Sequence, residues 1–336
     1  MKDPRAKQEP KRASGRRDLL RWVIGLVVAV VAMWLLLRIL DWQEVLQALR
    51  TADYSWVVLA LVAIVGTFVS RTLRWQALLY HSDIRFQPAM TGLLIGQVVN
   101  LALPIMRSGD VARAFWANHR GSSGVSETLG SIALEKMWDL IALCACGLIL
   151  LIAVPLPTWF AQSTWGTLLV VGVGILLLSL MLHWQEPLLR FAARLMARLP
   201  ARWAAFVTPQ LSQLIEALDA LRDPGASASA GLWTAVTWSL GGLANWAVMQ
   251  AFGVDSVLAA IFLLAALMLG GAVVPTPAGV GVYEGICVVS LGLFDVEPSI
   301  ALAIGLVLHL IVIGPALIAA ALLAMVNSIT SAPERA

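Results

Sequence analysis

The chain of 336 residues is 60% hydrophobic and 13% charged, whereas about 25% of the residues in an ordinary soluble domain are charged. This composition excludes a soluble globular enzyme and indicates an all-α polytopic membrane protein, built from apolar runs of about 20 residues. The formal net charge of +3 decides little, since topology depends on where charges lie along the chain. We expect no soluble domain and no nucleic-acid partner.

Cysteine and histidine give no sign of a metal site. The three cysteines lie inside apolar runs without the spacing of metal ligands or of a redox pair, and the four histidines are scattered. We expect the cysteines to be packing residues, and we expect no cofactor. These residues are Cys144, Cys146, Cys287, His81, His119, His183 and His309.

The N-terminal region predicts that the chain begins on the cytoplasmic side of the membrane. Residues 1–18 are polar and basic, which indicates a disordered cytoplasmic tail. Residues 19–40 form a run longer than a signal-peptide core, with no small-residue cleavage site, so we expect an uncleaved first helix. Residues 41–55 form an acidic loop suited to the outer face, and Trp56–Leu79 returns as a second helix.

Two arginines lie in the inner half of this second helix. Arg71 and Arg74 are three residues apart and therefore share one helix face. Either they extend to the lipid headgroups, as long basic side chains do at helix ends, or they line a polar site.

The run from Pro88 to Pro104 is short and polar for a spanning helix. The segment after it carries more arginine than acid. If the run crossed the membrane, this basic segment would lie outside, against the positive-inside rule. A re-entrant hairpin that enters from the cytoplasm removes the conflict. The polar and glycine positions are Gly92, Gly96, Gln97, Asn100, Arg107, Asp110, Arg113 and Arg120.

The next predicted helix, Val125–Val154, carries a polar stripe. Ionisable groups at membrane depth normally face a bundle interior or a wet cavity. We expect at least one of Arg107 and Arg113 to pair with an acid of this stripe or with Glu284. The stripe has steps of four residues, with Lys136 beside it, and consists of Glu127, Ser131, Glu135 and Asp139.

Residues 155–336 predict a connector followed by a second group of membrane helices. After an uncharged outer loop at residues 155–165 and a crossing at residues 165–183, residues 184–224 read as an amphipathic connector on the cytoplasmic surface. The second half then holds a span, an apolar hairpin and a last helix. Their predicted ranges are 231–252, 256–274 with 285–294, and 300–325, followed by a cytoplasmic tail at 326–336.

A broken stretch occurs twice in the chain. Residues 100–113, the first break, and residues 271–284, the second break, each run from an apolar segment through proline and glycine to a charge nine residues after the proline. The prolines, Pro104 and Pro275, are 171 residues apart. Matching breaks in two halves point to the substrate site of a transporter, although ordinary loops that cap two hairpins are the alternative.

The charges of the flanking loops indicate that the two halves of the chain have opposite orientations in the membrane. The loops that flank the second hairpin are acidic, so both should lie outside, whereas the first hairpin enters from inside. This predicts two inverted repeats, at about residues 56–154 and 231–325, within one transmembrane domain at 19–325. About eight fully spanning helices remain the alternative. We expect interfacial anchors at Trp22, Trp42, Trp56, Trp75, Trp159, Trp165, Trp184 and Trp233.

Four motifs together carry a family resemblance. In order, they are Arg71-x-x-Arg74-Trp75, Asn100-x-x-x-Pro104-x-x-Arg107-x-Gly109-Asp110-x-x-Arg113, Glu135-Lys136-x-x-Asp139 and Pro275-x-Pro277-x-Gly279-x-Gly281-x-x-Glu284. Over about residues 20–325 this ordered set resembles the family built on the membrane region of lysylphosphatidylglycerol synthase. That family includes the flippase half of the bacterial multiple-peptide-resistance protein.

The resemblance implies an inner-membrane protein that moves a lipid between leaflets. Its central polar cavity would include Arg107, Asp110, Arg113, Glu135, Asp139 and Glu284. His309 departs from the arginine that we expect in the last helix of many relatives. Since the chain stops at Ala336, the aminoacyl-transferase domain of the synthases is expected to be absent, and synthase activity is not carried over.

Three functions are compatible with these features. The first is a flippase or scramblase for an anionic phospholipid or a polyprenyl-phosphate-linked lipid in a bacterial inner (plasma) membrane, with both termini cytoplasmic. The others are a membrane-embedded lipid-modifying transferase and a non-transporting scaffold of a cell-envelope lipid pathway. Assembly into a homo-oligomer is compatible with each of the three. No metal cluster, activated nucleophile or nucleotide loop favours an enzyme. We assign substrate binding to Arg71, Arg74, Asn100, Pro104, Arg107, Gly109, Asp110, Arg113, Glu135, Asp139, Pro275, Pro277, Gly279, Gly281, Glu284 and His309.

Overall fold

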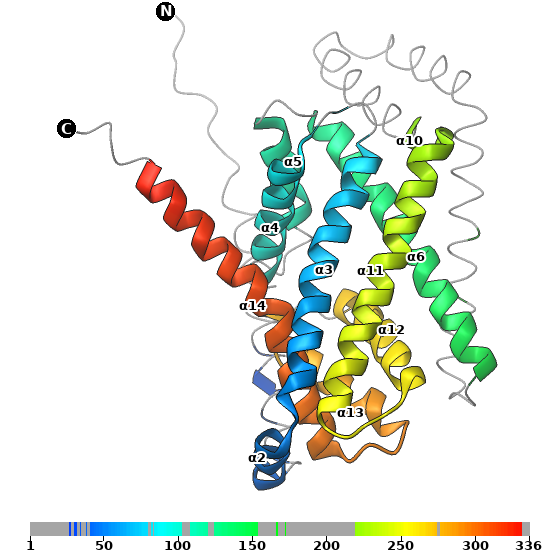
Figure 1. Cartoon of the computed structure of the whole chain (residues 1–336), viewed down its shortest axis with the longest axis vertical. Helices are drawn as coiled ribbons and strands as arrows, with labels where there is room; N and C mark the ends of the chain where they lie inside the picture. The colour runs from blue at the N-terminus through cyan, green and yellow to red at the C-terminus, as the bar shows by residue number, and fades with distance from the viewer. Residues whose placement is uncertain are drawn as a thin grey trace, which may run out of the picture.

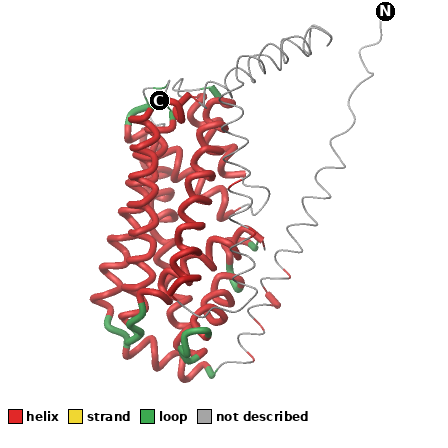
Figure 2. The backbone as a smooth tube through the Cα atoms, turned by 90° about the vertical axis from the view of Figure 1, so that its right-hand side faces the viewer, coloured by secondary structure: helices red, strands yellow, loops and turns green. Residues whose placement is uncertain are grey.

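The computed structural model describes residues 41–79, 84–102, 108–119, 124–153, 219–273 and 276–330, with a few single positions between them. Every regular element in these ranges is a helix (Figures 1 and 2). Loops lie mainly at the two ends of the bundle (Figure 2). The predicted terminal tails, the crossing at 165–183 and most of the first apolar run and of the connector lie outside the described residues.

Within the described part, three helices are long and apolar enough to cross a membrane. They are α3 (Tyr54–Leu78), α6 (Val125–Ala153) and the segment Pro298–Ile318 of α14 (Pro298–Thr330). The expectation of a helical membrane protein is therefore confirmed. Pro315 lies inside α14, and the helix continues through it beyond the predicted end at residue 325.

Helix α11 (Pro224–Ala251) forms the central pair with α3, and the two run antiparallel (Figure 1). Near one end, Trp56 and Trp246 meet edge to face with ring centroids 5.4 Å apart. Towards the other end, the hydroxyls of Ser70 and Thr237 are 2.8 Å apart and share a hydrogen bond. Small and hydroxyl residues let two helix backbones approach closely where lipid supplies no hydrophobic drive for association.

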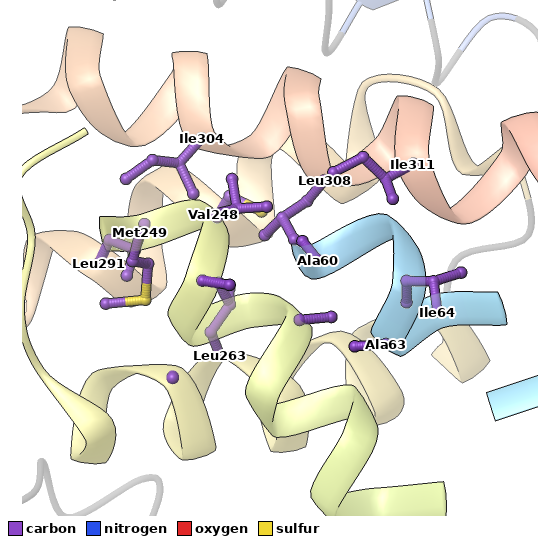
Figure 3. Close-up of a cluster of buried hydrophobic side chains, with 14 of the residues drawn as sticks. Ala60, Ala63, Ile64, Val248, Met249, Leu263, Leu291, Ile304, Leu308 and Ile311 are labelled. Carbon is purple, nitrogen blue, oxygen red and sulfur yellow. The ribbon is translucent and has the colours of Figure 1, made fainter. Parts of the chain in front are cut away.

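The main apolar core lies between α3, α11, α14 and the short helices of the second half (Figure 3). Many of its members are alanines, and larger side chains fill the space between them. Close helix packing therefore replaces bulky side-chain contact over much of this core. Residues labelled in Figure 3 are Ala60, Ala63, Ile64, Val248, Met249, Leu263, Leu291, Ile304, Leu308 and Ile311.

The first broken segment forms a helical hairpin of α4 (Phe86–Ala102) and α5 (Ser108–His119). At 1.5 Å per residue, α5 is about 18 Å long, which is shorter than a hydrocarbon core of about 30 Å. The two helices touch at glycine. A Cβ on Gly109 would lie 1.9 Å from the Gly96 carbonyl oxygen, and the Gly109 N–H donates to Asn100 Oδ1 at 2.8 Å.

The second broken segment joins α12 (Val257–Val273) to α13 (Val282–Gly292) through the short helical turn η1 (Pro277–Gly279). Three residues here adopt left-handed backbone: Ala278 at φ 53°, Gly279 at 79° and Gly281 at 82°. Glycine adopts this region without the steric penalty of a Cβ. This hairpin lies at the end of the bundle opposite α5 (Figure 1), and η1 packs against α4.

Two predicted boundaries are wrong. The supposed outer loop at residues 41–55 contains α2 (Trp42–Thr51), whose N-cap Asp41 accepts from Gln43 N at 2.8 Å. Val45 of α2 is buried against α14. Helix α11 begins at residue 224 and not at 231, because Asp223 caps it by accepting from Ala226 N at 2.6 Å. Capping side chains set both starts, which an apolar-run criterion overlooks.

Candidate functional site

A buried carboxylate on α6 holds two arginines from other helices. Glu135 is fully buried, and its Oε2 accepts from Arg113 Nη1 of α5 at 2.9 Å. Arg74 of α3, only 1% exposed, places Nη2 3.1 Å from Glu135 Oε1. Glu135 therefore joins the long helices α3 and α6 to the hairpin helix α5. The expected pairing of Arg113 with an acid of the polar stripe is confirmed.

One helical turn further along α6, Asp139 extends the network. Its Oδ1 accepts from Arg74 Nη1 at 2.7 Å, and Arg74 Nη1 also lies 3.2 Å from Thr234 Oγ1 of α11. Trp238 Nε1 of α11 is 3.4 Å from the same carboxylate oxygen. Arg74 therefore does not extend to the headgroups, because its guanidinium is enclosed by partners from α6 and α11.

Two further cations lie at the more open side of this network. The nitrogens Arg71 Nη2 and Lys136 Nζ are each 4.0 Å from Glu135 Oε1. Their side chains are 27% and 32% exposed. We call the six residues the ionic cluster. With four cations and two carboxylates, it carries two more positive than negative charges, and its members are Arg71, Arg74, Arg113, Glu135, Lys136 and Asp139.

Arg113 is positioned by an aromatic ring and leaves donors unused. Its Cζ lies 3.7 Å from the centroid of the Trp75 ring, and Trp75 Nε1 donates to Ser131 Oγ at 3.1 Å. Arg113 Nε and Nη2 and Arg74 Nε are buried without a hydrogen-bond partner in the described part of the chain. A buried donor left unpaired costs about 1–3 kcal/mol, so these N–H groups favour an acceptor.

The second break builds a separate cluster around His309 of α14. His309 Nδ1 is 2.6 Å from Glu284 Oε1, and His309 Nε2 is 2.8 Å from the Ala278 carbonyl oxygen. The Tyr283 ring stacks on the imidazole at 4.5 Å. Gly281 N donates to Glu284 Oε2 at 2.7 Å. The four residues Ala278, Tyr283, Glu284 and His309 are called the imidazole cluster below.

The candidate residues thus separate into two groups that share α4 as a neighbour. α4 packs against α5, which carries Arg113, and also against η1 and α14 of the imidazole cluster. Glu284 pairs with His309, and no described arginine is within ion-pair distance of it. Asp110 lies half-buried on α5, and Asn100 and Gly109 join α4 to α5.

Some candidates have no described side chain. Pro104, Arg107 and Pro275 lie outside the described residues, and only the backbone of Pro277 is described, in η1. Among the described residues, no group of three or more histidine, cysteine, aspartate or glutamate side chains could hold a metal ion.

The predicted role of Trp75 as an interfacial anchor is wrong. It was expected to anchor the helix at the membrane interface, but it is fully buried beneath Arg113. The motif Arg71-x-x-Arg74-Trp75 placed it beside two arginines, and a tryptophan face is the surface that a buried guanidinium prefers. Thr234 and Trp238 of α11 were not singled out, since their partners on α3 and α6 are distant in sequence.

A family model, the lysylphosphatidylglycerol synthase transmembrane region, matches residues 22–320. The chain belongs to this family. All residues of the ionic and imidazole clusters lie within the matched region. The resemblance seen in the four motifs is therefore confirmed.

Family relatives carry two kinds of name. The chain is 26% identical over 324 residues to glycosyltransferase AglD of Haloferax volcanii, an alignment that covers 85% of this chain and 51% of the relative. It is 27% and 23% identical to two UPF0104 membrane proteins of Methanothermobacter thermautotrophicus, over 76% and 86% of this chain and 79% and 90% of theirs. The chain thus spans about half the length of the relative named for an activity.

Proposed function

We propose that the protein moves an anionic lipid, either a phospholipid or a polyprenyl-phosphate-linked lipid, between the leaflets of a bacterial inner membrane. The observation that carries the proposal is the ionic cluster, where four cations face two carboxylates and buried arginine N–H groups lack acceptors among the described residues. A phosphate group would supply both the negative charge and the acceptor oxygens.

Arginine suits this task because its planar fork matches two phosphate oxygens. Arg113 uses Nη1 on Glu135 and keeps Nε and Nη2, adjacent donors on the other edge of the guanidinium, unpaired in the described part. Trp75 fixes the plane of the guanidinium from below. Arg113 is therefore the side chain that we assign to direct headgroup contact, with Arg71 and Lys136 as the more exposed entry charges.

The arrangement of helices supports transport by two inverted repeats with re-entrant hairpins. α3 begins the first half and α11 begins the second, and these two helices are antiparallel (Figure 1). Each is followed by a hairpin with at least one arm shorter than a membrane span, α5 or α13, and then by a long helix. In this topology both termini are cytoplasmic, and the two breaks approach the bilayer midplane, where transporters bind substrate.

A lipid-modifying transferase is the second candidate, favoured by the name of the AglD relative and by the buried Glu284–His309 pair, which has the composition of an acid–base pair. In the ionic cluster, by contrast, Glu135 and Asp139 are each already engaged by arginine. The two functions differ in whether a donor group is consumed.

The test is leaflet exchange of fluorescent anionic phospholipids and of a polyprenyl phosphate in proteoliposomes. Arg113→Lys keeps the charge but replaces the fork by a single ammonium, so exchange should fall about tenfold or more, the equivalent of about 1.4 kcal/mol. Arg50→Lys on α2 is the matched control and should exchange at the parent rate, since Arg50 is exposed and lies outside both clusters.

Turnover of a labelled polyprenyl-phosphate-sugar donor, measured in the same vesicles, tests the transferase. Donor consumption without exchange would establish the transferase and refute transport. A folded parent with neither activity would leave the scaffold role, and a folded Arg113→Lys variant that exchanges every lipid at the parent rate would refute the headgroup assignment.

The topology has its own test. In a variant without the three native cysteines, single cysteines at Ser122 and Ser256 should react with an impermeant thiol reagent from opposite sides of the membrane. Ser122 follows the first hairpin, and Ser256 precedes the second. Labelling of both from one side contradicts the inverted repeat.

A further inference from the structure

The hydrogen bonds of His309 determine where its protons lie. The Ala278 carbonyl oxygen can only accept, so His309 Nε2, 2.8 Å away, carries a hydrogen and donates it. The opposite ring nitrogen, Nδ1, is 2.6 Å from Glu284 Oε1. An ionised carboxylate is also only an acceptor, so this contact requires one more proton between Nδ1 and Oε1.

The pair therefore holds one shared proton. Whether that proton is bonded to Nδ1 or to Oε1, the sum of the charges on Glu284 and His309 is zero. Without it, two lone pairs face each other at 2.6 Å, the pair carries one negative charge, and the contact becomes repulsive. The presence of the proton decides whether His309 of α14 is bonded to Glu284, while the Nε2 bond to Ala278 remains in either state.

Among the described elements that pack against α14, the shared proton is the charge next to His309 that can change. α13 contributes Tyr283, stacked on the ring, and Cys287, one turn beyond Glu284. The helices α4 and α11, which also contact α14, contain no charged residue. On α3, Arg71 and Arg74 belong to the ionic cluster. On α2, Glu44 accepts from Ser299, ten residues before His309 on α14.

We propose that Glu284 and His309 form a proton-binding site that couples lipid movement to a proton gradient. The inference rests on the proposed transport function and names its coupling ion. A hydrogen-bonded carboxylate–imidazole pair at membrane depth is the chemistry of a proton relay. Loss of the proton breaks the Nδ1–H bond, passes H⁺ to water on one side, and leaves neutral imidazole beside carboxylate.

Loss of the shared proton should alter the conformation of the second break. His309 bonds to Ala278 and Glu284, which lie on either side of the positive-φ residues Gly279 and Gly281. η1 in turn packs against α4, the partner of the hairpin helix that carries Arg113. Loss of the Nδ1–Glu284 bond therefore leaves the Ala278 bond as the remaining His309 contact to the second break, which loosens the segment between the two clusters. One proton carried with a singly charged headgroup also leaves the net charge transfer at zero.

The experiment imposes a pH gradient of one unit across proteoliposomes and measures the inner-to-outer ratio of a fluorescent anionic phospholipid. With one proton per lipid, the parent should shift this ratio by about tenfold, because one pH unit is a tenfold difference in proton activity. A protonophore should abolish the shift. In the reverse direction, a lipid gradient should move protons, reported by a trapped pH-sensitive dye.

Glu284→Gln and His309→Gln should lose the shift and the proton flux. The matched controls Glu297→Gln and His119→Gln should keep both, since each residue is exposed and outside the two clusters. An even lipid ratio in an actively exchanging parent, at either sign of the gradient, overturns the coupling and leaves transport intact. A parent that exchanges no lipid overturns the transport function instead.

A measurement independent of transport then judges the proton site. The ¹⁵N spectrum of histidine-labelled protein, assigned through His309→Gln, should show protonated Nε2 and an Nδ1 that shares a strong hydrogen bond with Glu284. The Nδ1 signal should disappear in Glu284→Gln. An Nδ1 that neither carries nor accepts a hydrogen-bonded proton at any accessible pH, or a spectrum unaffected by Glu284→Gln, overturns the site.

Discussion

The strongest energetic prediction concerns removal of the charge of Glu135. Glu135→Gln preserves shape but leaves Arg113 without its carboxylate partner, while Arg74 keeps Asp139 at 2.7 Å. Because Arg113 is almost fully buried, the loss in unfolding free energy should be about 3–5 kcal/mol. Arg113→Gln should be milder, about 1–3 kcal/mol, since Glu135 retains Arg74 at 3.1 Å.

The double variant should lose less than the sum of the single losses, by about 1–3 kcal/mol, because each change alone leaves the other group stranded. The assay is thermal unfolding in detergent followed by tryptophan fluorescence. The control Asp295→Asn alters an exposed carboxylate in the turn after α13 and should stay within about 0.5 kcal/mol of the parent. Additive losses, or a larger loss for Arg113→Gln than for Glu135→Gln, would refute the pairing.

Two glycine substitutions test the hairpins by the same unfolding assay. Gly109→Ala places a methyl group 1.9 Å from the Gly96 carbonyl oxygen, so α4 and α5 must separate, at a cost of about 1–3 kcal/mol. The control Gly242→Ala on α11 has open space around its Cβ and should be neutral or stabilising. Equal effects of the two variants would contradict the close contact between α4 and α5. Gly281→Ala forces a Cβ into φ 82° and should cost about 1–2 kcal/mol, and an unchanged melting temperature would contradict the left-handed turn.

Much of the helical framework could be predicted from sequence because a segment that spans a bilayer must be apolar and must satisfy its own backbone hydrogen bonds. Apolar runs gave helices close to α3, α6 and α12, and Gly/Pro interruptions located both hairpins. Helix α2 was missed because its sequence is half polar. The earlier start of α11 depends on Pro224 and the Asp223 cap, a local signal that a hydropathy window averages away.

The site was less accessible to sequence reasoning. A four-residue step along α6 correctly placed Glu135 on an inward face, and charge complementarity identified Arg113 as a partner. Nothing in the pattern separated Glu284 from that network, because the separation depends on His309, 25 residues later, reaching back to the second break. Trp75 was misread because a tryptophan near a helix end has the same sequence signal whether it faces lipid or a buried cation.

The bonds of Arg74 have a consequence for how the protein is made. Arg74 leaves the ribosome well before its partners, Asp139 65 residues later and Thr234 160 residues later. At about 5–20 residues per second, the last of these is synthesised roughly 10–30 s after α3. During that interval a cationic helix must wait in or beside the bilayer with its polar face uncovered. We therefore expect early insertion of α3 to depend on shelter from the insertion machinery until these partners are made.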